Sequence, residues 1–274
     1  MKAILGVHYG HVSSACLLID GIIVAHISEE RLTRAKNDSS FPVKAIEFCL
    51  KKAGIDSLEL DCVAFSKSEF YNDLLLYFDT SLLNLKINTS VRQAIKSIAK
   101  KTLKSQVNLT EMPLYLSPWK LSENCQLHFC GHHKGHAASA YYTSGINDDK
   151  VLIITMDGVG EGVSAAVWSG YRGKIKNLIS YGPDAPIGFF YSAATEALGW
   201  RASGEEWKLM GLAPYGSTKP GLLNGYHPEF LDGILTKPHD FGTWGTLLDH
   251  GSFHYHCKDS IHLQKFVHAL GPED

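Results

Sequence analysis

Apolar residues near the N-terminus fall into three short runs that are separated by polar turns. Their lengths predict β-strands at residues 3–8, 14–19 and 22–28. The last two strands are joined by Asp20-Gly21, a dipeptide that is typical of a tight hairpin turn. The chain therefore begins with an antiparallel three-stranded meander.

A change from strand spacing to helical spacing follows this meander. SFPVKAIEFCLKKAGI has apolar residues on one helical face, with Ser40 as the expected N-cap and Gly54 as the stop. Further strands are predicted in DCVAFSK (61–67) and CQLHFCGHH (125–133), and a helix that Gly145 ends is predicted in HKGHAASAYYTSG.

The same order of elements then begins again. VLIITMDGVGEGVSAAVWSGYRGKIKNLISYG (151–182) predicts three strands, of which the first ends at Asp157, and FFYSAATEALGW predicts the helix after them. A duplicated β-β-β-α unit implies two similar lobes with a cleft between them. We expect an α/β fold with a first lobe at 1–148, which contains an inserted helical segment at about 69–120, and the start of a second lobe at 149–274.

Composition excludes several classes of protein. The formal net charge of -2 provides no positive field for nucleic acid or an anionic membrane. No apolar run approaches the roughly 20 residues of a membrane span. The six cysteines form no C-x-x-C pair, and Cys16, Cys49 and Cys62 lie in apolar runs as expected for buried free thiols. We therefore expect a cytoplasmic protein with neither nucleic-acid nor membrane partners.

The inserted segment is basic between residues 86 and 104. It holds several lysines and an arginine, with no acid between Asp79 and Glu111, and its apolar residues recur at helical spacing. We favour a helix with a solvated basic face. The alternative is a patch that binds a phosphate-bearing substrate or partner.

Three histidines within five residues stand out in HHKGHAASA. His132 and His136 are four apart, so a helix would place them on one face, one turn apart. Asp157 ends an apolar strand and precedes three glycines, where its carboxylate could complete a metal site and Gly158 and Gly160 could offer N–H groups to an anion. Two histidines and one carboxylate suit Fe²⁺, Zn²⁺ or Mn²⁺. The alternatives are a chance surface pair and an ordinary Asp-Gly turn.

Other polar residues could serve a ligand nearby. His11, in the matching loop of the first lobe, could act as a general base or hydrogen-bond donor. Residues 29–42, EERLTRAKNDSSFP, are predicted to form a polar loop, and the cations Arg34 and Lys36 in it could bind a phosphate or carboxylate. Lys208 lies among glycines in GEEWKLMGLAPYGS, which is not a P-loop.

These stretches together resemble one family. GVHYGHVSSACLLIDGIIVAHISEERLTRAKNDSSFP is similar to the N-terminus of the nodulation-type and antibiotic-tailoring O-carbamoyltransferases. HHKGHAASAYYTSG, DGVGEG and GEEWKLMGLAPYG resemble three further blocks of that family, in the same order, over about residues 2 to 217.

The resemblance implies an actin-like ATPase fold of two ribonuclease-H-like lobes, related to the tRNA threonylcarbamoyl transferases. It implies that carbamoyl phosphate and ATP give carbamoyladenylate in another domain, and that this domain passes the carbamoyl group to a hydroxyl of a small-molecule acceptor in natural product biosynthesis. By the same resemblance, His132, His136 and Asp157 hold a divalent metal, with Fe²⁺ preferred over Zn²⁺ or Mn²⁺. His11 lies near the carbamoyl group, and Glu161 belongs to the substrate-binding glycine loop.

Two departures from the family pattern change the expectation. Val12 stands where the family has an aspartate, and the chain has about half the family's length. We therefore expect a fragment with an incomplete second lobe and no adenylating domain. The alternative functions are an actin-like Mg-ATP-dependent kinase or ATPase, and an inactive fragment that acts as a binding module. The sequence leaves the acceptor and the oligomeric state open.

Overall fold

The structure is a computed structural model of the 274-residue chain. It describes residues 1–66, 78–79, 119–146, 149–183, 187–201, 204–217, 219–221, 227, 229–236 and 268. Most of the inserted segment, including its basic residues 86–104, lies outside the described residues. The chain divides into two compact units, Met1–Gly131 and His132–Asp274.

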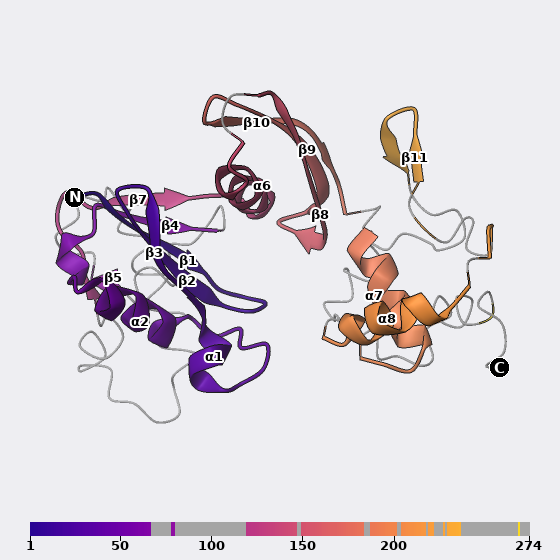
Figure 1. Ribbon diagram of the computed structural model, residues 1–274, viewed down its shortest axis with the longest axis horizontal. Coiled ribbons are helices and arrows are strands. Elements are labelled where there is room, and N and C mark those ends of the chain that lie inside the picture. The colour runs from indigo at the N-terminus through magenta and orange to yellow at the C-terminus, as the bar shows by residue number, and fades with distance from the viewer. Residues whose placement is uncertain are drawn as a thin grey trace, which may run out of the picture. The chain divides into compact units, whose positions relative to one another are not determined.

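The first unit is built on a five-stranded mixed sheet (Figure 1). Its strand order is β3-β2-β1-β4-β7, with β1 antiparallel to β2 and parallel to β4. This order, with only the second strand reversed, is the ribonuclease-H-like arrangement. The strands are β1 (Ala3–His8), β2 (Ser14–Ile19), β3 (Ile22–Ser28), β4 (Cys62–Phe65) and β7 (Gln126–Phe129).

Helix α2 (Val43–Ala53) covers β2 and β3. Its inward face, which includes Ala45 and Ile46, packs on strand residues such as Leu5 and Leu17, and all four side chains are fully buried. Residues on alternate positions of β1 are buried because successive side chains of a strand point to opposite faces. The short elements of this unit are α1 (Glu29–Thr33), η1 (Ser57–Glu59), β5 (Phe78–Asp79) and β6 (Trp119–Lys120).

The start of α2 differs from the prediction. Its N-cap is Pro42, without a side-chain cap, and Ser40 donates its hydroxyl hydrogen to Asp38 instead. The carboxylate of Glu29, which is 2% exposed, accepts the N–H groups of Lys44 at 3.1 Å and Ala45 at 2.7 Å. A buried acid that begins the stretch EERLTRAKNDSSFP therefore satisfies the free amides at the start of this helix.

The second unit begins with α6 (His132–Thr143), which packs against β8 and β9. The sheet has the order β10-β9-β8 and is antiparallel throughout. Its strands are β8 (Val151–Gly160), β9 (Val163–Tyr171) and β10 (Lys174–Tyr181), and they are followed by α7 (Ile187–Ala197), α8 (Glu206–Leu212), η2 (Ala213–Tyr215), β11 (Glu229–Leu231) and β12 (Ile234–Thr236).

The order of elements confirms the predicted repeat. Each unit contains an antiparallel meander of three strands that is followed by a helix. The predicted α/β fold of the ribonuclease-H-like, actin-like ATPase class is therefore confirmed, whereas the completeness of the second lobe stays a prediction. Within the described ranges, no helix is long and apolar enough to cross a membrane.

The predicted free thiols are confirmed within the part of the chain that the structure describes. Cys49 and Cys62 are buried free cysteines, and Cys16 is partly buried. Burial raises the pKa of the Cys49 thiol to about 11, so it stays protonated at neutral pH.

Candidate metal centre

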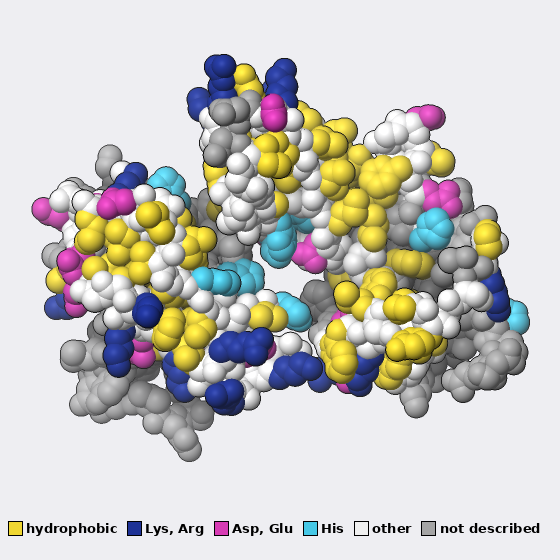
Figure 2. All heavy atoms as spheres, viewed as in Figure 1, with side chains coloured by type: hydrophobic (Ala, Val, Ile, Leu, Met, Phe, Trp, Pro, Cys, Tyr) yellow, Lys and Arg dark blue, Asp and Glu magenta, His cyan; other side chains and the backbone are white. Residues whose placement is uncertain are grey.

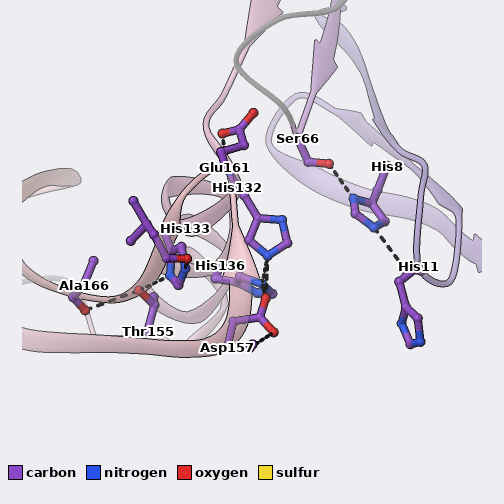
Figure 3. Close-up of polar contacts among 12 residues, drawn as sticks. His8, His11, Ser66, His132, His133, His136, Thr155, Asp157, Glu161 and Ala166 are labelled. Atoms are coloured by element: carbon purple, nitrogen blue, oxygen red, sulfur yellow. Dashed lines mark hydrogen bonds and ion pairs between the residues drawn. The ribbon is translucent and has the colours of Figure 1, made fainter. Parts of the chain in front are cut away.

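Three side chains that the sequence separates by up to 25 residues meet in the second unit. His132 and His136 lie one turn apart on α6, and Asp157 lies on the facing strand β8 (Figure 3). His132 Nε2 is 2.6 Å from Asp157 Oδ2 and 3.0 Å from His136 Nε2. His136 Nε2 is 3.5 Å from the same carboxylate oxygen. The three donor atoms therefore form one small triangle.

This triangle fits a divalent transition metal. Metal–ligand bonds of about 2.1 Å in a tetrahedral site place neighbouring donor atoms about 3.4 Å apart. Shifts of less than about 1 Å bring the observed distances to that value. The side chains of His136 and Asp157 are 53% and 38% exposed, and Figure 2 shows histidine side chains beside an acidic one next to β8. Two imidazoles and one carboxylate leave further coordination positions open on the solvent side.

The charges of the group also suit a cation. Hydrogen bonds from His132 and then from His136 hold the pKa of Asp157 well below its usual range, although burial opposes them. The hydrogen bond to Asp157 raises the pKa of His136. Asp157 is therefore ionised at neutral pH, and its negative charge faces the two imidazole nitrogens that a metal would share.

Gly160, the last residue of β8, and Glu161, the residue after it, hold His132 in place. Gly160 lies against the imidazole ring, because a Cβ at position 160 would be 2.7 Å from His132 Nε2 and still nearer to Cδ2 and Cγ. Glu161 Oε2 accepts the backbone N–H of His132 at 2.9 Å, which satisfies a free amide in the first turn of α6. Both residues were predicted to contact substrate, and the structure gives each a contact with a candidate ligand.

The glycine stretch has a different backbone from the one predicted. Strand β8 continues to Gly160, which pairs with Val163, and the register shifts between Met156 and Gly160. The expectation that the strand ends at Asp157 is therefore wrong, because the partner strand β9 extends the pairing. The Gly158 N–H donates to Asp157 Oδ1 at 2.7 Å.

The first turn of α7 supports Asp157 from another side. A Cβ at Gly188 would be 2.5 Å from the Gly158 nitrogen and 2.7 Å from the Asp157 carbonyl carbon, so only glycine permits this approach. Phe189 lies against Gly158, where a Cβ would be 2.6 Å from its ring. Sequence reasoning missed Gly188, and its place in IGFF carries no local signal of this contact.

Sequence reasoning also did not assign His133 a role of its own at the site. It is 5% exposed and lies between Thr155 and Val163, with its ring centroid 5.5 Å from that of His132 and 6.1 Å from that of His136. Burial lowers the pKa of His133, so the ring is neutral at physiological pH. The adjacent pair His132-His133 was a usable signal, because adjacent helical residues point in different directions.

The remaining predicted residues lie elsewhere. His11 is exposed on the first unit, where its carbonyl oxygen is 3.2 Å from His8 Nε2. Arg34 and Lys36 are exposed after α1 in the same unit. Lys208 lies on α8, with Nζ 2.6 Å from Glu205 Oε1. Substrate contact by these residues stays a prediction.

Comparisons with known proteins agree on one family. A family model for the carbamoyltransferase N-terminus matches residues 3–232. An uncharacterized protein of Synechocystis sp. is 33% identical over 279 residues, which cover 99% of this chain and 42% of that protein. The nodulation protein NolNO of Sinorhizobium fredii is 30% identical over 235 residues, which cover 82% of this chain and 32% of that protein.

A solved structure gives a more distant likeness. Component A of (R)-2-hydroxyglutaryl-CoA dehydratase from Acidaminococcus fermentans is 12% identical, with a TM-score of 0.43, over 82% of this chain and 63% of that one.

The chain spans less than half the length of the Synechocystis and Sinorhizobium relatives. The family model covers most of the chain, in the region that holds both sheets and the three converging side chains. The chain belongs to the carbamoyltransferase N-terminus family.

Proposed function

We propose that this chain transfers a carbamoyl group from carbamoyladenylate to a hydroxyl group of a small-molecule acceptor, with a divalent metal held by His132, His136 and Asp157. Carbamoyladenylate would come from carbamoyl phosphate and ATP. The observation that carries the proposal is the convergence of these three side chains, whose donor atoms lie 2.6 to 3.5 Å apart, in a member of the carbamoyltransferase family.

The three ligands would contribute to metal binding in different ways. Asp157 contributes a full negative charge, and the two imidazoles contribute neutral nitrogen donors once His136 has lost its proton. These ligands would hold Fe²⁺, our preferred ion, or Zn²⁺ or Mn²⁺, which would supply Lewis acidity and positive charge to an anionic substrate. The exposed sides of His136 and Asp157 leave room for such a substrate.

Other residues of the chain would bind substrate and move the proton. The acceptor oxygen attacks the carbamoyl carbon, AMP leaves with the electrons of the broken C–O bond, and the hydroxyl proton passes to a base. His11 is our candidate for that base, because its side chain is exposed and imidazole is the commonest general base in enzymes. Lys208 would exchange its contact with Glu205 for a substrate phosphate, and Arg34 and Lys36 are the other candidate cations.

The test supplies carbamoyladenylate directly, so that it needs no adenylating domain. Hydroxylamine replaces the unidentified acceptor, and the products are hydroxyurea and AMP in equal amounts, both measured by chromatography. We expect the metal-loaded wild-type chain to exceed the protein-free rate and His136→Ala to lose that excess. His26→Ala, an exposed histidine on β3, is the matched control and should keep the wild-type rate.

Two results would contradict the proposal. One is a metal-loaded wild type that releases AMP no faster than His136→Ala. The other is hydrolysis of Mg-ATP without carbamoyladenylate and without dependence on His136, which would favour the kinase or ATPase alternative. No turnover in either assay, together with no metal uptake, would favour the binding module.

A further inference from the structure

We infer that a buried hydrogen-bond network of His133, Thr155 and Trp168 positions the metal ligands by fixing α6 against β8. The inference rests on the proposed metal site, and it assigns a positioning role to three residues that do not belong to the ligand set. Their side chains are 5%, 5% and 7% exposed, so water does not compete for these contacts.

The donors and acceptors of the network can be assigned. His133 Nε2 is 2.9 Å from the Val163 carbonyl oxygen, which only accepts, so Nε2 carries the proton. His133 Nδ1 is 2.9 Å from Thr155 Oγ1, and the Ala166 carbonyl oxygen is 3.3 Å from the same hydroxyl, so the nearer Nδ1 is the preferred acceptor of its hydrogen. Trp168 Nε1 donates to the same oxygen at 3.2 Å. One hydroxyl thus links α6, β8 and β9.

The network lies beside the candidate ligands on both elements. His133 follows His132 directly on α6 and is three residues from His136. Thr155 is two residues before Asp157, so both side chains leave β8 on the same face. A shift of α6 relative to β8 at this level would move two donor atoms away from the third.

Apolar packing alone would not fix this register. Ala137 and Tyr141 of α6 pack on Ile153, Ala166 and Trp168, but apolar contacts have no direction, and a small residue such as Ala137 permits sliding. Hydrogen bonds weaken steeply with angle, so a buried set of them selects one position of the helix. The ligand triangle needs that selection, because metal–ligand distances tolerate only about 0.2 Å.

The test removes the hydroxyl without changing the shape of the side chain. In Thr155→Val, His133 Nδ1 and Trp168 Nε1 lose their shared partner, and we expect the Kd for Co²⁺ to rise by about tenfold, as for loss of a residue that supports a ligand. Thr155→Ser restores the hydroxyl and should restore most of the affinity. The visible absorption of bound Co²⁺ should change in Thr155→Val and return in Thr155→Ser.

A matched control separates positioning from general stability. Thr195 of α7 is fully buried, and its hydroxyl donates to the Tyr191 carbonyl oxygen at 2.9 Å. Thr195→Val loses a buried hydroxyl in the same unit, so it should lower the melting temperature and leave the Co²⁺ affinity and spectrum unchanged.

The outcomes distinguish this inference from the proposed function. A wild-type chain that binds no Co²⁺, Zn²⁺, Mn²⁺ or Fe²⁺ overturns both. Wild-type binding that Thr155→Val leaves intact overturns the inference alone, as does an equal loss in Thr195→Val. If Thr155→Val does not fold, Co²⁺ binding by Trp168→Phe is measured instead, because this variant removes one hydrogen-bond donor of the network. Weaker Co²⁺ binding supports the inference, and unchanged binding overturns it.

Discussion

One methyl group at position 160 should disable the candidate metal centre. An alanine Cβ there would lie 2.7 Å from His132 Nε2 and closer to two other ring atoms. Carbon atoms that are not bonded rest about 3.5 to 4.0 Å from their neighbours, and His132 Cδ2 would be only 2.1 Å away, so the ring must move by roughly 1.5 Å. The backbone cannot yield as easily, because Gly160 pairs with Val163 in the sheet.

The displaced ring could return to the binding position only by overlapping the new methyl group. His132 would therefore be lost as a ligand, since metal–ligand distances hold within about 0.2 Å. We expect Gly160→Ala to weaken metal binding by about 100-fold, the upper end of the effect of losing a supporting contact. The metal-free protein should lose about 1 to 3 kcal/mol of unfolding free energy from the added volume.

Calorimetric titration of metal-free protein with Mn²⁺ measures the affinity, and urea denaturation measures the stability. Gly182→Ala is the matched control, because the same methyl group at position 182 meets no atom within 4 Å. A folded Gly160→Ala variant that binds Mn²⁺ as tightly as Gly182→Ala would refute two assignments. These are the role of His132 as a ligand and the contact of its ring with Gly160.

Three further predictions concern the framework of the two units. Glu29→Ala should lower the free energy of unfolding by about 2 to 3 kcal/mol in urea, since the buried amide of Ala45 and the partly buried amide of Lys44 lose their carboxyl acceptor, and unchanged stability would contradict this role. Val12 has a φ of 61°, a backbone conformation that costs a β-branched residue about 1 to 2 kcal/mol. Val12→Asn should therefore raise the melting temperature, and a lower melting temperature would contradict the presence of this strain. Burial lowers the pKa of His133, so the unfolded chain binds a proton on this residue that the folded chain does not as pH falls below about 6.5. His133→Gln should therefore make the free energy of unfolding of the metal-free protein fall less, or rise more, between about pH 7.5 and about pH 5.5, and an unchanged pH dependence would contradict this role.

Local patterns were sufficient for the first meander. The strands at 3–8, 14–19 and 22–28 agree with the structure at every boundary. Each boundary depends on a few adjacent residues, such as the hairpin turn at Asp20-Gly21, where both residues have positive φ. Such turns form from local geometry and need no information from distant parts of the chain.

Elements that depend on distant contacts were not predictable in this way. The cap of α2 comes from Glu29, 16 residues before Ala45, so the local candidate Ser40 was chosen wrongly. The stretch after β3 was expected to be a loop, yet it begins with the short helix α1. Strand β8 extends beyond Asp157 only because β9 pairs with it.

The candidate site likewise contains features that local sequence predicts and features that depend on distant contacts. Helical spacing was enough to place His132 and His136 on one face, and the strand end suggested Asp157 as their partner. The contacts of Gly188 with the Asp157 backbone and of His133 with Thr155 arise from packing between elements. No spacing rule within one segment encodes them.

The most direct test of the central claim is the metal content of the chain after anaerobic purification and loading with Fe²⁺, measured by elemental mass spectrometry. We expect about one metal per chain in the wild type, as one set of three ligands requires, and loss of that metal in His132→Ala/His136→Ala and in Asp157→Asn. His26→Ala should retain it. A wild-type chain that takes up no Fe²⁺, Zn²⁺ or Mn²⁺, or a His132→Ala/His136→Ala variant that binds as much metal as the wild type, would contradict the assignment of His132, His136 and Asp157 as a metal centre.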